Sequence, residues 1–156
     1  MAISFSVDEN QLMQMAIIEA KRAPEHSDVP VGALLLRENK IVSSRHNERE
    51  LTKDPTAHAE ILVLKDAAEK FGSWYLTECT LVVTLEPCLM CAGAMINSRI
   101  KRVVFGALDS KAGACGSLYN VCDDSRLNHQ ISVTSGIQAK SCGELLSEFF
   151  RKLRKS

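Results

Sequence analysis

The stretch TLEPCLMCAGAMINSRI, residues 84–100, links a short β-branched run to a long apolar one. TLVVT, residues 80–84, has the composition of a buried strand. Pro87 suits the first turn of a helix, because the N–H that proline lacks has no intrahelical partner there. Cys88 and Cys91 are three residues apart and therefore lie on one face of such a helix. The stretch predicts a strand followed by a helix with two thiols at its N-terminus.

Working outward from this stretch, strands and helices are expected to alternate along the chain. Helices are predicted from the capping box at Ser6–Glu9 to near Pro24, from Asp54–Pro55 to Gly72, from Pro87 to about Ser98 and from Ser141 to about Leu153. Strands are predicted at Val31–Leu36, Lys40–Arg45, Thr80–Thr84, Lys101–Gly106 and, weakly, Ile131–Thr134. The polar turn at residues 37–39 predicts an antiparallel hairpin, and the later alternation predicts parallel neighbours with helices over both faces. A long surface loop is expected over residues 107–128.

Length and composition indicate a single globular domain over residues 1–156, with 46% hydrophobic and 24% charged residues. Lys plus Arg and Asp plus Glu both number 19, so the net charge does not indicate a nucleic-acid partner. The C-terminal tail is the basic exception. It is either a solvated helix end or a phosphate-contacting patch, and its basic residues are Arg151, Lys152, Arg154 and Lys155.

The chemical state expected for the six cysteines depends on the cellular compartment of the protein. The N-terminus lacks a secretion signal, and no apolar run approaches the ~20 residues of a membrane span. We therefore expect a cytoplasmic protein without a membrane partner, in which disulfides are disfavoured and closely spaced cysteines bind metal or catalyse. Four cysteines have no such spacing and are expected to be buried or incidental thiols: Cys79, Cys115, Cys122 and Cys142.

His58 and Glu60 lie in DPTAHAEI, at the start of the second predicted helix. In α/β proteins the N-termini of such helices gather at the carboxyl edge of the sheet, where their partial positive charge favours thiolates. One imidazole and two thiolates are ligands that zinc prefers, and they leave the open vertex of a catalytic site. Glu60 would lie far from His58 around an ideal helix, but both can approach a metal off the helix tip. We expect His58, Cys88 and Cys91 to bind one Zn²⁺ per subunit, with Glu60 as the general acid and base.

Two other interpretations of these residues remain open. A structural zinc site would need a fourth ligand, which His26, His46, His129 or another cysteine would have to supply. A Cys-x-x-Cys redox pair is also possible, but it would leave His58 and Glu60 without a role.

The combination of His-x-Glu with Pro-Cys-x-x-Cys is the signature of the zinc nucleobase deaminases. The chain closely resembles the bacterial tRNA-specific adenosine deaminases over roughly residues 8–154. The matching segments are VPVGA (29–33), Asn47, DPTAHAEI (54–61), TLEPCLMCAGAMINSRI (84–100) and RVVFGALDSKAGACGSL (102–118).

This resemblance implies a cytidine-deaminase-like three-layer α/β/α sandwich with a mixed five-stranded sheet, assembled as a homodimer. It also implies hydrolysis of adenosine to inosine at the wobble position of the tRNA anticodon arm, with water activated by zinc and Glu60 protonating the ring N1. Asn47 and the backbone of Ala59 would hold the base. The residues that would contact the surrounding RNA are Asp109, Lys111, Phe149, Phe150 and Arg151.

Without the resemblance, Asn47 is equally well explained as a turn residue. Asp109 and Lys111 are then explained as an ordinary solvated pair of loop residues. Asn97 departs from the resemblance, because relatives are expected to carry a bulkier or histidine side chain there, and this affects packing or RNA contact rather than chemistry. Two rival functions use the same residues: deamination of a free base or nucleoside, and non-catalytic RNA binding by a zinc-stabilised domain. The loop at residues 102–118 argues against the first.

Overall fold

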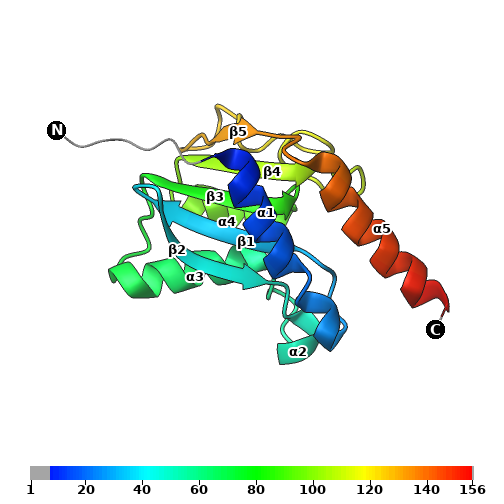
Figure 1. Ribbon diagram of the computed structural model, residues 1–156. Coiled ribbons are helices and arrows are strands. Elements are labelled where there is room, and N and C mark those ends of the chain that lie inside the picture. Colours follow the sequence, from blue (N-terminus) through cyan, green and yellow to red (C-terminus); the bar gives the residue numbers. More distant parts are fainter. Residues whose placement is uncertain (1–7, 156) are drawn as a thin grey trace.

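The computed structural model describes residues 8–155 and contains one five-stranded sheet with the order β2-β1-β3-β4-β5 (Figure 1). The strands are β1 (Gly32–Arg37), β2 (Lys40–His46), β3 (Cys79–Leu85), β4 (Arg102–Ala107) and β5 (Ser132–Thr134). The helices are α1 (Glu9–Ala20), η1 (Ala23–His26, a 3₁₀ turn), α2 (Arg49–Thr52), α3 (Ala59–Phe71), α4 (Leu89–Asn97) and α5 (Ala139–Lys155). Within the described residues, no helix has the length and apolar character needed to cross a membrane.

The sheet is mixed, as predicted. β1 pairs antiparallel with both β2 and β3, whereas β3–β4 and β4–β5 are parallel. The β1–β2 hairpin turns at Glu38 and Asn39, whose φ angles of 53° and 63° are left-handed. Two left-handed residues give a tight turn whose twist matches that of the flanking strands, which explains how so short a connection closes the hairpin.

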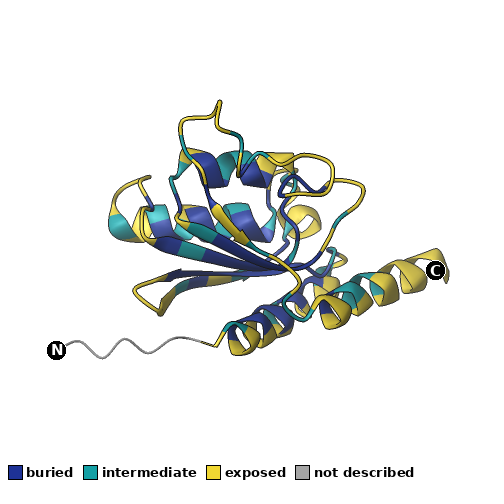
Figure 2. Ribbon diagram, turned by 90° about the horizontal axis from the view of Figure 1, so that it is seen from above, coloured by how far each residue is buried: buried dark blue, intermediate teal, exposed yellow. Residues whose placement is uncertain are grey.

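Helices cover both faces of the sheet, which confirms the predicted three-layer sandwich (Figure 2). Alternate residues of the central strands face opposite layers. Leu35, Leu81 and Phe105 pack in the core beneath α3 and α4. Leu34 and Val82 pack in the core beneath α1 and α5. Because these strands are buried on both faces, their sequences are continuous apolar runs and do not alternate between hydrophobic and polar residues.

The starts of α1 and α3 differ from the prediction. The N-cap of α1 is Asp8, whose carboxylate accepts a hydrogen bond from the Asn10 N–H at 2.9 Å; Ser6 lies outside the described residues. Asp54 does not start α3. Its side chain accepts hydrogen bonds from the Thr56 N–H and the Thr56 hydroxyl, and these bonds close a separate turn. The helix begins five residues later, at Ala59. The four-residue helix α2 was not predicted.

The segment between β4 and β5 contains neither a named helix nor a strand, as expected, but it is not purely a surface loop. Ala114 and Cys122 are fully buried and contribute to the core beneath α3 and α4. The four cysteines outside the Cys-x-x-Cys pair are buried, which confirms that prediction. Two of them nevertheless lie close together, with the Cys115 and Cys122 sulfurs 3.5 Å apart.

Gly32 is required where α1 crosses β1. A Cβ atom at this position would lie 2.1 Å from the Ala16 carbonyl oxygen and 2.6 Å from the Ala20 nitrogen, both of the helix backbone. We predict that Gly32→Ala lowers the free energy of unfolding by about 1–3 kcal/mol, because the helix must move away from the sheet. Gly93→Ala is the matched control, since the added Cβ would have no neighbour within 4 Å apart from the adjacent residues and the backbone of its own helix. It should leave stability unchanged or raise it by up to ~1 kcal/mol. Urea unfolding of both variants measures the difference, and equal midpoints would contradict the close-contact argument.

Candidate active site and metal centre

Two helix N-termini meet at the carboxyl end of β3. His58 is the N-cap of α3, with φ −78° and ψ 149°, and Cys88 is the N-cap of α4, with φ −76° and ψ 176°. Both residues are therefore extended and stand just outside their helices, rather than in the first turn after a proline as predicted. Neither makes a side-chain capping hydrogen bond. Their side chains are consequently directed to a shared site instead of back onto the helix.

These N-caps and Cys91 form a compact cluster of donor atoms. The His58 Nδ1 atom lies 3.6 Å from the Cys88 sulfur and 3.3 Å from the Cys91 sulfur. All three ligand atoms lie within 4.8 Å of one another. One imidazole nitrogen and two sulfurs at this spacing fit a zinc ion, which takes tetrahedral nitrogen and sulfur ligands. Within residues 8–155 the cluster has three members, which leaves a fourth vertex for a small molecule.

The two thiols differ sharply in acidity. A hydrogen bond from Cys91 lowers the pKa of Cys88 to about 4, and the neighbouring His58 acts in the same direction. The same bond raises the pKa of Cys91 well above its ordinary value. Hydrogen bonding to Cys88 also raises the pKa of His58. The cluster therefore combines a thiol of lowered pKa with a thiol of raised pKa, both close to the imidazole.

Glu60 lies in the first turn of α3, beside this cluster, and is only 4% exposed. Burial raises the pKa of its carboxyl group, against the opposing effect of the nearby His58 charge. Because His58 lies outside the helix, the wide separation expected for two residues of one ideal helix does not apply. A carboxyl group with a raised pKa in such a position can both accept and return a proton.

A cleft of about 800 Å³ opens over the cluster. It brings together most of the sequence-predicted site residues, namely Asn47, His58, Glu60, Cys88, Asp109, Lys111 and Phe150. Cys91 and Ala59 are fully buried behind this wall. Arg151 is not among the residues that line the cleft.

Asn47 is held against the start of α3. Its Oδ1 atom accepts a hydrogen bond from the Ala59 N–H at 2.8 Å, and Asn47 itself is buried. This bond occupies the backbone donor of Ala59, which the resemblance assigned to the base. Because the Asn47 oxygen is used in this bond, the group that Asn47 offers to the cleft is the hydrogen-bond donor, its side-chain amide nitrogen.

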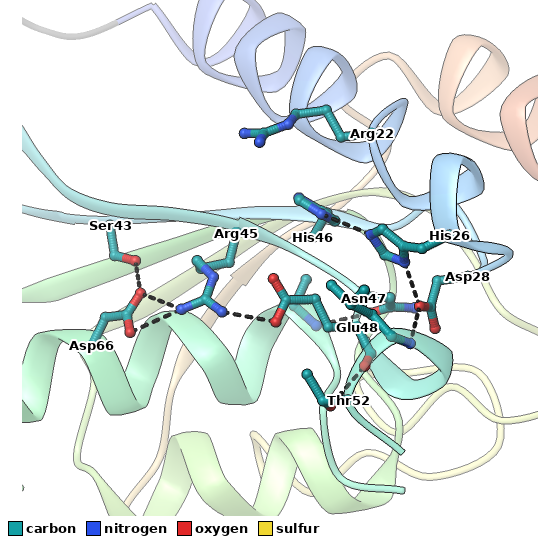
Figure 3. A network of polar contacts seen from close by, with 12 residues as sticks. Arg22, His26, Asp28, Ser43, Arg45, His46, Asn47, Glu48, Thr52 and Asp66 are labelled. Atoms are coloured by element: carbon teal, nitrogen blue, oxygen red, sulfur yellow. Dashed lines mark hydrogen bonds and ion pairs between the residues drawn. The ribbon is translucent and has the colours of Figure 1, made fainter. Parts of the chain in front are cut away.

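A polar network fixes the segment around Asn47 (Figure 3). His46 donates or accepts at both ring nitrogens, contacting Glu19 at 2.8 Å and His26 at 3.1 Å. His26 in turn lies 2.6 Å from the buried carboxylate of Asp28. The chain of contacts links α1, the η1 turn and the end of β2, and therefore limits movement of the adjacent Asn47.

Asp28 extends the network to α2. Its two carboxylate oxygens accept hydrogen bonds from the Glu50 N–H at 2.9 Å and the Leu51 N–H at 3.2 Å. Donors at the start of a helix otherwise lack partners, so this carboxylate explains how a four-residue helix is maintained. Arg49, the first residue of α2, lines the cleft as a result.

Two charged residues of the cleft, Arg49 and Glu86, were not predicted, and a third, Arg154, was considered only as part of the basic tail. Arg154 could have been identified from helical spacing. It lies four residues after Phe150 and therefore shares its helix face, whereas Arg151 is turned about 100° away from Phe150. Arg49 and Glu86 carried no local signal, because long-range contacts place them.

Comparison with known proteins agrees with this geometry. Residues 7–154 match the MafB19-like deaminase family. A tRNA-specific adenosine deaminase of Bacillus subtilis is 50% identical over 143 residues, covering 92% of this chain and 89% of the relative. A tRNA-specific adenosine deaminase of Aquifex aeolicus is 48% identical over 142 residues, covering 91% of this chain and 93% of the relative.

Solved structures lead to the same family. One from work on A-to-I editing by tRNA:A34 deaminases is 38% identical, with a TM-score of 0.84, and covers 87% of this chain and 99% of that one. A guanine deaminase from Nitrosomonas europaea shares the fold at 23% identity and a TM-score of 0.76, covering 94% and 86%. The cluster of His58, Cys88 and Cys91, the adjacent glutamate and these relationships together show that the chain belongs to the MafB19-like deaminases and, among them, to the tRNA-specific adenosine deaminases.

Proposed function

We propose that this protein hydrolyses adenosine to inosine at the wobble position of tRNA anticodons, as a single cytoplasmic domain over residues 1–156 that acts as a homodimer. The observation that carries the proposal is the meeting of His58, Cys88 and Cys91 beside buried Glu60, at the base of a cleft with basic side chains. The relatives named above as tRNA-specific adenosine deaminases support the substrate.

His58, Cys88 and Cys91 would hold one zinc ion per subunit. When bound, zinc supplies Lewis-acid activation of a water molecule, which makes water nucleophilic at neutral pH. Cys91 is enclosed, whereas Cys88 borders the cleft. That arrangement presents the reacting side of the site to substrate and screens the other side from solvent.

Glu60 carries the proton transfers. Its carboxylate takes a proton from the attacking water and delivers it to N1 of adenine, so that the ring can accept the new C6–O bond. A second transfer to the amino group allows ammonia to leave, and inosine is the product. Burial suits this cycle, because it brings the pKa of Glu60 closer to that of the groups between which the proton moves.

The walls of the cleft would bind the nucleotide and its neighbours. The Asn47 amide nitrogen is placed to donate to the base, while Ala59 orients Asn47 through its N–H. Asp109 and Lys111 lie on one wall, and Phe150 of α5 lies on another. Aromatic and basic side chains suit an anticodon loop, whose unstacked bases can be splayed into a protein. Arg151 is assigned to the RNA border by the resemblance alone.

Zinc binding should release protons. Because Cys91 has a raised pKa, its thiol must lose a proton when zinc binds, and the raised pKa of His58 adds to the protons released. We predict that zinc affinity falls by about tenfold or more for each pH unit of acidification from pH 8 to pH 7. Calorimetry in buffers of different ionisation enthalpy measures the proton count. Cys79→Ala, at the opposite end of β3, is the control and should bind zinc like the parent. Affinity independent of pH would contradict this account of the site.

Removing the Glu60 carboxylate should abolish turnover without loss of metal. We predict that Glu60→Gln lowers kcat by about 10²–10⁴-fold, because the amide cannot shuttle a proton. Inosine in bacterial tRNA, read by sequencing, is the assay, with free adenosine, cytosine and guanine as comparison substrates. Zinc content and thermal midpoint should match those of the parent. Equal turnover in the variant would eliminate Glu60 as the catalytic residue, and ammonia from a free base alone would reassign the substrate.

The C-terminal helix offers a matched pair of arginines. Arg154 lines the cleft with Phe150, whereas Arg151 points elsewhere on the same helix. We predict that Arg154→Ala weakens tRNA binding more than Arg151→Ala and flattens the salt dependence by about 0.7 in the log–log slope, the value for one phosphate of a single strand. Titrations at several salt concentrations give both quantities. A larger effect of Arg151→Ala would show that the other face of α5 meets the RNA.

A further inference from the structure

Glu86 is a buried carboxylate that the chemistry described above does not use. It follows β3 directly, precedes Pro87 and Cys88, and is only 2% exposed. Within residues 8–155 it forms no ion pair with a basic side chain. Burying a charge without a counterion is costly unless hydrogen bonds replace its hydration shell. The donors that do so all belong to one loop.

Both oxygens of Glu86 accept hydrogen bonds from residues 109–117. Oε1 accepts from the Asp109 N–H at 3.0 Å and from the Ser117 hydroxyl. Oε2 accepts from the Cys115 N–H at 3.1 Å and the Ser117 N–H at 3.0 Å. These contacts join both ends of the loop to a single carboxylate, and they lower the pKa of Glu86 despite its burial.

The loop is shaped to enclose this carboxylate. A Cβ atom on Gly113 would lie 2.3 Å from the Glu86 carboxyl carbon and within 2.5 Å of both oxygens. Gly113 also forms a β-bridge with Cys88, and the Ala114 N–H donates to the Pro87 carbonyl at 2.9 Å. The loop backbone is therefore aligned along the segment that carries a metal ligand.

Glu86 also fixes the part of the loop that lines the cleft. It holds the Asp109 N–H, and the Asp109 Oδ1 atom accepts from the N–H groups of Lys111 at 3.0 Å and Ala112 at 3.1 Å. Two successive hydrogen-bonded steps thus lead from Glu86 to Lys111. Leu108, Asp109, Ser110, Lys111 and Ala112 together form one wall of the cleft.

We propose that Glu86 is a positioning residue whose carboxylate serves as the internal template of the 109–117 loop and sets the distance between the metal-ligand segment and the RNA-facing wall. It acts on RNA affinity through Asp109 and Lys111 rather than on the chemical step. Its effect on RNA rests on the proposed function, whereas its effect on the loop does not.

Glu86→Gln tests this role, because it keeps the shape of the side chain and replaces one acceptor oxygen with a donor that faces loop N–H groups. Amide hydrogen exchange on the zinc-loaded full chain is the first measurement. We expect exchange at Asp109, Cys115 and Ser117 to accelerate about tenfold or more, while amides of α3 and β1 keep their parent rates. Glu69→Gln, the same substitution at an exposed site on α3, is the control and should change none of these rates.

Steady-state kinetics on tRNA give the second measurement. We expect KM for tRNA to rise about tenfold in Glu86→Gln, with a smaller change in kcat and full zinc content. A role limited to overall stability would lower the thermal midpoint and the active fraction while leaving KM unchanged. Ser117→Ala removes one donor and leaves three, so it should shift KM in the same direction by less, and it covers the case in which Glu86→Gln fails to fold.

The outcomes separate the two proposals. Parent-like exchange at the three loop amides and a parent-like KM in Glu86→Gln would overturn the template role. If the parent protein forms no inosine in tRNA, the proposed function fails, but loop exchange in Glu86→Gln still decides whether Glu86 organises the loop.

Discussion

The site depends on two helices beginning at one point in space. His58 and Cys88 are N-caps of α3 and α4, and both are extended, with ψ angles of 149° and 176°. A helical residue directs its side chain back over its own preceding turn, whereas an extended N-cap is free to direct its side chain elsewhere. The imidazole and the thiol can therefore converge, and Cys91 joins them from the first turn of α4.

The sheet provides this constraint. β2 runs parallel to β3 because each is antiparallel to β1, so the connections to α3 and α4 leave the same edge of the sheet. The cores on the two faces hold the helices in place, with α3 and α4 packed together on one side. Rigid elements thus hold the three candidate metal ligands and Glu60. Proton transfer by Glu60 would need such rigidity, because donor and acceptor must lie within hydrogen-bond reach.

The walls of the cleft are built differently. Asn47 and Arg49 are held by a chain of polar contacts through His46, His26 and Asp28, and the opposite wall is held by Glu86. These walls contain irregular backbone whose N–H groups have no ladder or helix partner, and buried carboxylates supply the missing acceptors. The candidate metal ligands and Glu60 therefore stand at the starts of helices, whereas Asn47 and residues 108–112 line the cleft from loops that carboxylates shape. Asp28 and Glu86 have corresponding roles on the two sides of the site.

The amino-acid sequence was enough to predict the layers and the mixed sheet, and it brought forward His58, Glu60, Cys88 and Cys91, which lie together in the structure. Apolar periodicity and the His-x-Glu and Cys-x-x-Cys spacings are local properties, so they can be read without coordinates. Helix starts were less well predicted, because the Asp54 side chain closed a turn instead of capping α3. Two features could be seen only in the tertiary structure: Asn47 pairs with the Ala59 N–H, and Glu86 lies inside a loop more than twenty residues away. Those features depend on hydrogen bonds between distant segments, which exist only once the sheet has brought the segments together.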